Sequence, residues 1–204
     1  MYGFINVQKR EGIVLATIFE NRSAEWEQEL VGEMCCFIEQ IRDDPTVQVV
    51  IFNRIKQEDL YRSGNTASAG VSAGSMEKLF DDMERMKPVT IAVIDGVVAG
   101  SCLGFFMTCN FRVAAEAARL DFSFENGALP LQSEIRRVET LTGAMRAREL
   151  FLTGGIICAG TAMQFSLINK TAEPEHLMAE SIELAKRIRM KDPVLVDRVS
   201  STLK

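Results

Sequence analysis

Two small residues, Gly100 and Ser101, stand where a buried strand is expected to give way to a helix, and they offer the clearest site for chemistry in this sequence. The start of a helix leaves backbone N–H groups without intrahelical partners, and the positive end of the helix dipole lies behind them. Small side chains let a ligand oxygen approach this backbone closely. The pattern therefore predicts a site for an oxygen that gains negative charge during a reaction, as in a thioester enolate.

The segments on either side of these two residues predict how they are held. Val89–Ile94 is an apolar, β-branched run without polar alternation, which is typical of a strand covered on both faces. Asp95 and Gly96 interrupt the run, and the largely apolar residues 102–109 predict a buried helix. A strand, a glycine turn and a helix also occur as plain packing in many α/β proteins, so this pattern alone leaves both interpretations open.

Composition and charge exclude several classes of protein. With 204 residues, 47% of them hydrophobic, the chain is long enough to bury one core, and we expect residues 1–204 to form a single domain. A net charge of −5 without a basic block argues against nucleic acid as the main partner. The apolar run from Val89 to Phe111 is interrupted by Asp95 and by glycines, which argues against a membrane span.

Cysteine and histidine usage narrows the setting further. The five cysteines are an odd number without spaced pairs, and the first twelve residues contain no apolar signal region, so we expect a cytoplasmic protein. His176 is the only histidine, which excludes a metal site built from several histidines, and we expect no metal. Its position in the first turn of an expected helix predicts a surface residue.

Hydrophobic periodicity and turn residues predict the remaining elements. Strands are expected at 4–10, 13–19, 47–53, 112–114 and 167–171, and helices at 25–42, 73–86, 143–152, 174–189 and from about 193 onward. Glu11 and Gly12 predict a tight hairpin between the first two strands. The succession of strands and helices indicates an α/β protein.

Three separated motifs give a more specific prediction. They are KPVTIAVIDGVVAGS at 87–101, CNFRVAAEAARL at 109–120 and TGAMRARELFLTGGIICAGTAMQFSLINK at 142–170. Together they closely resemble the crotonase (enoyl-CoA hydratase/isomerase) superfamily, in the same order along the chain. The resemblance runs from about Phe4 to the C-terminus. It implies an α/β fold built as a spiral of ββα turns, with a C-terminal helical tail shorter than is usual in the family.

The resemblance also implies where a thioester carbonyl would be held. The N–H group of Ser101 would supply one donor of an oxyanion hole, and Gly64, in the polar loop after the strand at 47–53, would supply the other. Asn65 then stands where the family usually has an aspartate. Val97, Gly100, Asn65 and Phe124 are expected to contact the substrate. From its own composition, the glycine-, serine- and alanine-rich stretch 63–74 also fits a mobile loop without a catalytic role.

The sequence departs from the hydratases of this family where their two catalytic glutamates are expected. Residue 104, the position of the first, is glycine. The second motif is shortened, so Glu125 is the nearest acid, although it would equally suit a solvated turn before Asn126 and Gly127. Glu134 replaces a glycine of the family's pocket wall and is a second candidate acid/base group, and Asp121 is a third.

The resemblance implies an enzyme that acts on an acyl thioester, carried by CoA or by the phosphopantetheine of an acyl-carrier protein, through a stabilised enolate and without a further cofactor. Loss of the first glutamate favours an isomerase or a lyase over a hydratase. A decarboxylase of the polyketide β-branching type is an alternative, supported by SGNT at 63–66 but weakened by Ala67 where those enzymes usually have lysine. A non-catalytic partner subunit is another, and we expect a homotrimer or higher oligomer.

Overall fold

Strands and helices alternate along the chain in the computed structural model, which describes residues 2–19, 24–55, 72–124 and 129–203. The strands are β1 (Ile5–Arg10), β2 (Ile13–Phe19), β3 (Val49–Ile55), β4 (Val89–Ile94), β5 (Val97–Ala99), β6 (Phe111–Ala115), β7 (Arg119–Asp121), β8 (Ile156–Cys158) and β9 (Lys170–Ala172). The helices are α1 (Ala24–Ile41), α2 (Ala73–Glu84), α3 (Gly100–Thr108), α4 (Gln132–Thr142), α5 (Ala144–Thr153), α6 (Ala159–Gln164), α7 (Pro174–Arg189) and α8 (Pro193–Thr202).

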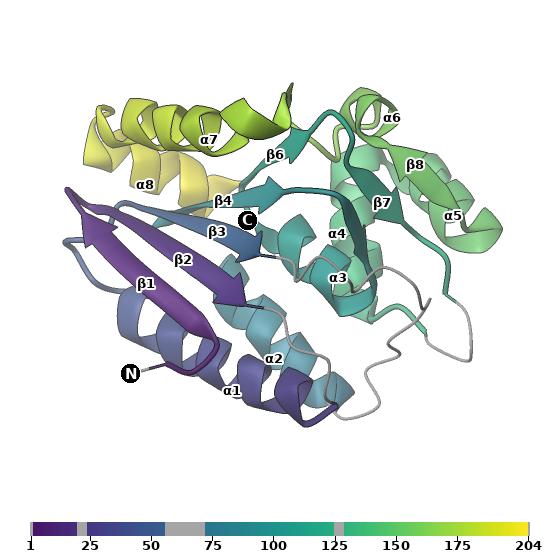
Figure 1. Ribbon diagram of the computed structural model, residues 1–204, viewed down its shortest axis with the longest axis horizontal. Coiled ribbons are helices and arrows are strands. Elements are labelled where there is room, and N and C mark those ends of the chain that lie inside the picture. Colours follow the sequence, from purple (N-terminus) through teal and green to yellow (C-terminus); the bar gives the residue numbers. More distant parts are fainter. Residues whose placement is uncertain (1, 20–23, 56–71, 125–128, 204) are drawn as a thin grey trace.

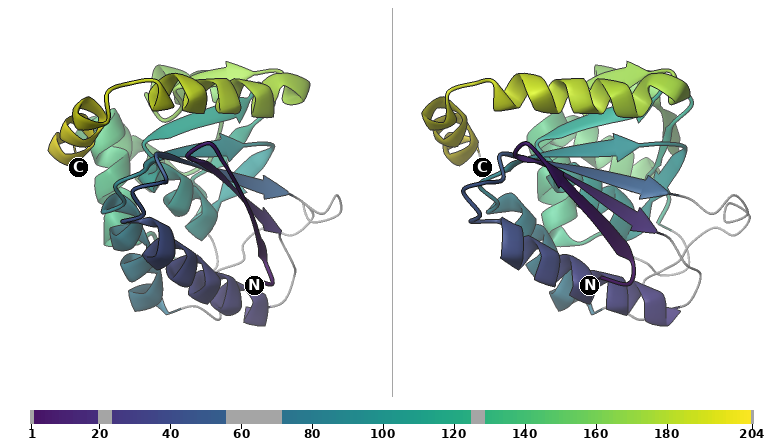
Figure 2. Two further views of the ribbon diagram at one scale, coloured as in Figure 1. Left: turned by 90° about the vertical axis from the view of Figure 1, so that its left-hand side faces the viewer. Right: turned by 60° about the vertical axis from the view of Figure 1, so that its left-hand side comes forward.

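The strands form two sheets. The larger has the order β1-β2-β3-β4-β6-β9, in which β1 and β2 are antiparallel and each later pair is parallel. The smaller has the order β5-β7-β8. Helix α7 crosses one face of the larger sheet, while α1 and α2 lie on the other (Figures 1 and 2). Because both faces are covered, the central strands can be apolar on both sides, and every residue of β4 is buried.

The hairpin between β1 and β2 follows directly from two residues. Arg10 pairs with Ile13, which leaves only Glu11 and Gly12 in the turn. Both have positive φ, at 50° and 79°, as the tight primed turn of a two-residue hairpin requires. Glycine adopts a positive φ without steric cost, which suits Gly12 to this turn. The pairing of Arg10 with Ile13 confirms the hairpin expected from the sequence.

Contacts in the C-terminal half of α3 hold this helix against neighbouring elements. The ring of Phe52 in β3 packs edge to face against two other rings. Its centroid lies 5.2 Å from that of Phe105 in α3 and 6.2 Å from that of Phe37 in α1. After the C-terminal end of α3, the guanidinium of Arg112 in β6 is buried. It donates from Nε to the carbonyl oxygen of Leu167 at 2.7 Å and from Nη1 to that of Met107 at 3.4 Å. A cation suits the negative end of a helix, and these bonds fix the end of α3.

Two sequence expectations differ from the structure. The last strand is β9, Lys170–Ala172, whereas the sequence predicted 167–171. Leu167 and Ile168 are buried in the core but precede the strand. The apolar residues at 167–168 therefore reflect burial in the core and not a strand. The smaller sheet, α4 and α6 were not expected. Strands β5, β7 and β8 have three residues each, α4 buries only Glu134 and Val138, and α6 has only six residues.

Candidate functional site

The site begins where β4 leads through a glycine turn and β5 into α3. Gly96 and Gly100 have positive φ, 67° and 55°, a region that side chains with a Cβ atom adopt at a cost. Ala99 is the N-cap residue, with an extended backbone and no side-chain hydrogen bond to the helix. A glycine with positive φ therefore stands on either side of β5, and the first turn of α3 is uncapped by a side chain.

This start of α3 has the properties of an anion site. The N–H groups of Gly100 and Ser101 have no partner within the helix, since they belong to its first turn, and Ala99 has no side-chain acceptor. The helix dipole adds a partial positive charge at the same place. Ser101 therefore lies in the uncapped first turn of α3, and its role as a donor of an oxyanion hole stays a prediction. Gly64 and Asn65, predicted for the other half, and Glu125 lie outside the described residues.

A small cavity opens beside this helix start. Its volume is about 10 Å³, close to the space that one water molecule needs. Gly100 and Gly104, one helical turn apart, form one wall, and Glu134 is the acidic residue among the lining side chains. Most of the other lining residues are apolar: Leu103, Met107, Phe122, Phe124, Val138 and Phe151.

Glu134 enters this cavity from the first turn of α4. Its side chain is 7% exposed, and its Oε2 atom accepts a hydrogen bond of 2.8 Å from the N–H group of Leu131, the N-cap residue. Burial among apolar side chains, opposed by this hydrogen bond and assisted by the negative charge of Glu77, raises the pKa of Glu134 to about 7. Such a carboxyl group exchanges protons near neutral pH.

The absence of a side chain at Gly104 leaves room for the carboxyl group of Glu134. A Cβ atom built on Gly104 would lie 2.1 Å from Oε1 of Glu134 and 2.7 Å from its Cδ atom. These separations are far below van der Waals contact, so a side chain at position 104 and the present Glu134 conformation exclude each other. The carboxyl group of Glu134 therefore occupies the space of the absent residue-104 side chain.

Three aromatic side chains close the cavity. Phe122 contacts Phe151 edge to face at 5.7 Å, and Phe124 contacts the same ring at 5.7 Å. Phe124 thus lines the cavity, and its contact with a substrate stays a prediction. The sequence did not predict that Phe151 lines the cavity, because this residue belongs to α5 and only the packing of the folded chain brings it there.

Asp121 and Val97 have structural contacts instead of lining the cavity. Oδ1 of Asp121 accepts a hydrogen bond of 2.8 Å from the N–H group of Ser123, which forms a local turn after β7. The carbonyl oxygen of Val97 accepts from Nη2 of Arg54 at 2.8 Å, and Nη1 of Arg54 lies 3.2 Å from Sγ of Cys102. Arg54 therefore ties the end of β3 to the start of α3, a role that the sequence analysis missed.

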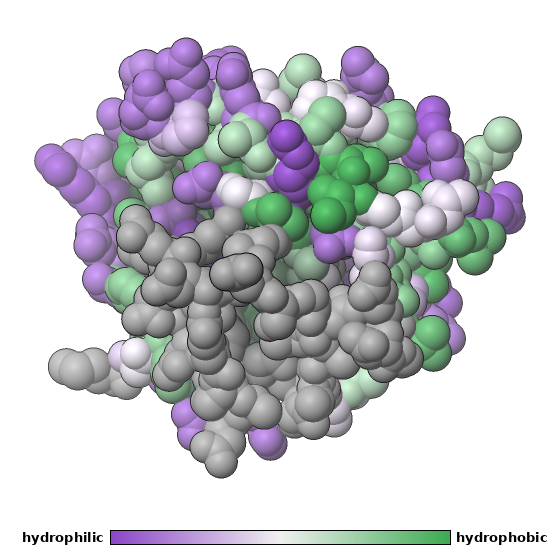
Figure 3. Space-filling model, turned by 45° about the vertical axis from the view of Figure 1, so that its right-hand side comes forward, coloured by the Kyte–Doolittle hydropathy of each residue, from purple (hydrophilic) through white to green (hydrophobic). Residues whose placement is uncertain are grey.

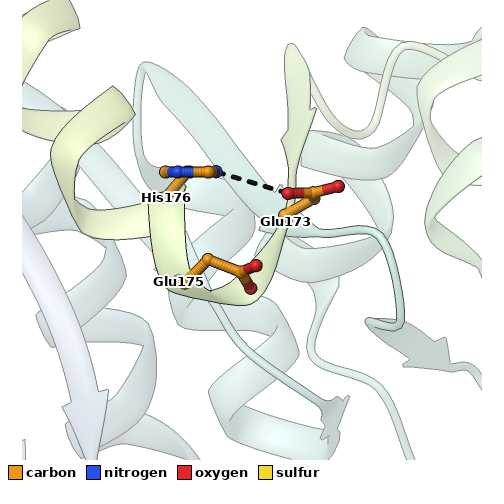
Figure 4. A group of neighbouring side chains, drawn as sticks. All are labelled: Glu173, Glu175 and His176. Atoms are coloured by element: carbon orange, nitrogen blue, oxygen red, sulfur yellow. Dashed lines mark ion pairs between the residues drawn. The ribbon is translucent and has the colours of Figure 1, made fainter.

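A group of metal-ligating side chains also lies at the start of α7. Ligand atoms of Glu173, Glu175 and His176 lie within 4.8 Å of one another, and all three residues are exposed (Figure 4). Nδ1 of His176 lies 3.4 Å from Oε2 of Glu173. The exposure of His176 confirms its prediction as a surface residue. Acidic residues at a helix start are explained by the helix dipole, and none of the three lines the cavity.

Comparison with known proteins agrees with this architecture. The family model of enoyl-CoA hydratase/isomerase matches residues 9–204. A crotonyl-CoA hydratase of Syntrophomonas wolfei is 28% identical over 76% of the chain, and the mitochondrial Delta(3,5)-Delta(2,4)-dienoyl-CoA isomerase of Dictyostelium discoideum is 23% identical over 99% of it and 77% of its own length. The chain spans 46 to 66% of the length of the bacterial hydratases that it matches.

Solved structures give the same result for the fold. The crystal structure of an enoyl-CoA hydratase from Bacillus anthracis superposes with a TM-score of 0.82 at 25% identity, over 97% of this chain and 81% of that one. The crotonase fold expected from the sequence is therefore confirmed. No helix in the described ranges combines the length and hydropathy that crossing a bilayer would take. With the family model covering nearly the whole sequence, the chain belongs to the enoyl-CoA hydratase/isomerase family.

Proposed function

We propose that this protein is an isomerase-type enzyme that acts on an acyl thioester through an enolate. The observation that carries the proposal is the start of α3, where the N–H groups of Gly100 and Ser101 are left without a side-chain cap beside an apolar cavity. The enolate oxygen would accept from Ser101 on one side and from the predicted donor Gly64 on the other. Donors held in place before the reaction stabilise such charge strongly.

Gly104 decides between isomerisation and hydration in this proposal. Hydration by two glutamates needs one group to activate water and another to move the second proton. The structure has glycine at 104, and a carboxyl group from another helix fills the space beside it. One proton-transfer group suffices for an isomerase, which removes a proton from one carbon and returns it to another. The dienoyl-CoA isomerase that matches 99% of the chain supports this choice.

The substrate proposed is an acyl-CoA or an acyl-carrier-protein thioester. The thioester carbonyl supplies the electron sink, so the proposal invokes no cofactor. Malonyl thioesters test the decarboxylase alternative, because loss of carbon dioxide itself generates the enolate. If the protein is instead a non-catalytic subunit, no thioester should turn over and none should raise the midpoint of thermal unfolding. Specific binding of a thioester to the folded state would raise that midpoint.

Substitution of Ser101 tests the oxyanion hole. Ser101→Pro removes the N–H group and should lower turnover by about 10²- to 10³-fold, the usual effect of one lost donor. Ser101→Ala keeps the N–H group and should change turnover little, because the backbone and not the hydroxyl group acts. Exchange of the α-proton of butyryl-CoA in deuterated water, with circular dichroism as the check on folding, measures both. A folded Ser101→Pro variant with unchanged exchange contradicts the proposal.

We also propose that the chain assembles into a homotrimer or higher oligomer. Helix α8 buries none of its residues, and Val194, Leu195 and Val199 are 68, 52 and 48% exposed. The side that carries α5 and β8 also shows hydrophobic surface in Figure 3, in agreement with the exposure of Leu152 and Ile156. Exposed apolar surface of this kind is typical of partner sites. Light scattering at micromolar concentration measures the mass, and a monodisperse monomer contradicts the proposal.

A further inference from the structure

The position of the Glu134 carboxyl group is unusual for a residue in the first turn of a helix. Glutamate at this position commonly folds back to the N–H group of the N-cap residue, and Oε2 does so with Leu131 at 2.8 Å. The side chain of Leu131 offers no acceptor in return, so only half of a capping box forms. Oε1 then points toward Gly104, where a Cβ atom would lie 2.1 Å away. The backbone contact thus fixes one oxygen and leaves the other at the cavity wall.

The location of Gly104 relates this carboxyl group to the proposed oxyanion hole. Gly104 lies four residues after Gly100 in α3, so the two share one face of the helix, about 6 Å apart along its axis. Both line the same cavity as Glu134. A thioester held by its oxygen at the start of α3 would therefore have its neighbouring carbons on the same helix face as Gly104, where they can extend toward Oε1 of Glu134.

The surroundings of Glu134 suit proton transfer. No lysine or arginine in the described segments forms an ion pair with it, and the side chains that share its cavity are largely apolar. The charged group that acts on it is Glu77 of α2, which is also negative. Because burial and the charge of Glu77 raise its pKa to about 7, the carboxyl group holds a proton at weakly acidic pH and releases it close to neutrality.

We propose that Glu134 is the proton-transfer residue of this protein, and that Gly104 is required because it leaves the space in which the Glu134 carboxyl group acts. This inference rests on the proposed function. With a 3-enoyl thioester, the Glu134 carboxylate takes a proton from C2, and the electron pair of the C–H bond forms the dienolate. The same carboxyl group returns the proton to C4, which moves the double bond to C2–C3. Atoms and charge balance without a co-reactant.

The first test compares Glu134→Gln with a matched control on the same helix. Gln retains an oxygen that can accept from Leu131 but cannot carry the proton, so isomerisation of 3-hexenoyl-CoA and α-proton exchange of butyryl-CoA should fall by about 10²-fold or more. The thermal shift produced by each thioester should persist, which separates chemistry from binding. Glu139→Gln, which changes an exposed glutamate of α4, should leave both rates unchanged.

The second test uses Gly104→Ala and the double variant. The added Cβ atom should displace the Glu134 carboxyl group and lower the exchange rate about 10-fold or more, since misplacement of a reacting group by about 1 Å is costly. In the Glu134→Gln background the same substitution should have no further effect. Independent, multiplicative losses would show that residue 104 does not act through Glu134 and would overturn the pairing.

The pH profile gives a readout that loss of folding would not produce. Proton abstraction needs the ionised carboxylate, so kcat/KM of the wild type should rise with pH through a pKa near 7. Glu134→Gln should lose that limb. Exchange that is present in the wild type and survives Glu134→Gln overturns the role of Glu134 and leaves the proposed function standing. Absence of exchange in the wild type with every thioester overturns both.

Discussion

Asp82 and Glu134 are buried to nearly the same degree, with exposed fractions of 5% and 7%, yet their surroundings differ completely. Asp82 in α2 lies 3.0 Å from Nζ of Lys78 and 3.6 Å from Nη1 of Arg42. Glu134 has one backbone N–H group as its hydrogen-bond donor and an apolar cavity around it. Burial removes water from both carboxyl groups, but among the described residues only Asp82 receives cations in exchange.

The difference separates a structural carboxyl group from a reactive one. Two cations compensate the negative charge of Asp82, and the contacts join α2 to the end of α1. Glu134 forms no ion pair with any cation in the described part of the chain, and its pKa is raised to about 7. A buried carboxyl group with a raised pKa costs stability whenever it ionises. Such a cost is common at functional sites, where reactivity is favoured over stability.

The largest expected effect on stability concerns the pH dependence of Glu134. Its pKa is raised from 4.5 to about 7 by folding, so the folded state binds the proton more tightly than the unfolded state. The stabilising contribution is complete below pH 4.5, is lost as pH rises and is gone above about pH 7. The full change corresponds to roughly 3 kcal/mol.

Urea unfolding of the wild type and of Glu134→Gln at several pH values measures this contribution. Gln stays neutral, so the two proteins should have similar free energies of unfolding at pH 4.5, and the variant should be more stable at pH 8 by up to roughly 3 kcal/mol. A difference that is constant across this range would mean that Glu134 ionises as easily in the folded state as in the unfolded chain.

A smaller effect is expected from the paired carboxyl group. Asp82→Asn removes the charge that faces Lys78 and Arg42 and should lower the free energy of unfolding by about 1 to 2 kcal/mol. The loss is less than for a fully buried pair, because the side chains of Lys78 and Arg42 are 58 and 41% exposed and remain partly hydrated. Unfolding at pH 7 checks the value, and a more stable variant would remove the contrast with Glu134.

The smallest effect is expected at the surface. Glu39 lies 3.3 Å from Nζ of Lys78, the same lysine that contacts Asp82, but Glu39 is 54% exposed. Water screens this pair, so Glu39→Gln should change the free energy of unfolding by less than about 0.5 kcal/mol. Raising the salt concentration should remove what difference remains. A loss as large as that of Asp82→Asn would show that burial is not what distinguishes the two contacts of Lys78.

Local sequence signals were sufficient for many elements of the fold. The β-branched run Val89–Ile94 forms β4 with the expected bounds, and Pro174 begins α7 as expected. Helix α3 begins at Gly100, as expected. The signals for this start are local, since the strand, the glycine turn and the apolar helix follow one another directly in the sequence. The motifs shared with the crotonase superfamily led to the family, which the match over residues 9–204 establishes.

The tertiary structure alone decided which groups meet at the site. The sequence shows a glycine at 104 and a glutamate at 134, thirty residues apart, and no local pattern relates them. Only the packing of α4 against α3 places the carboxyl group over the glycine, and only the burial that results raises its pKa. Phe151 likewise reaches the cavity through the fold. Spacing along a chain determines local structure, whereas desolvation and steric exclusion depend on distances between segments that only the folded protein sets.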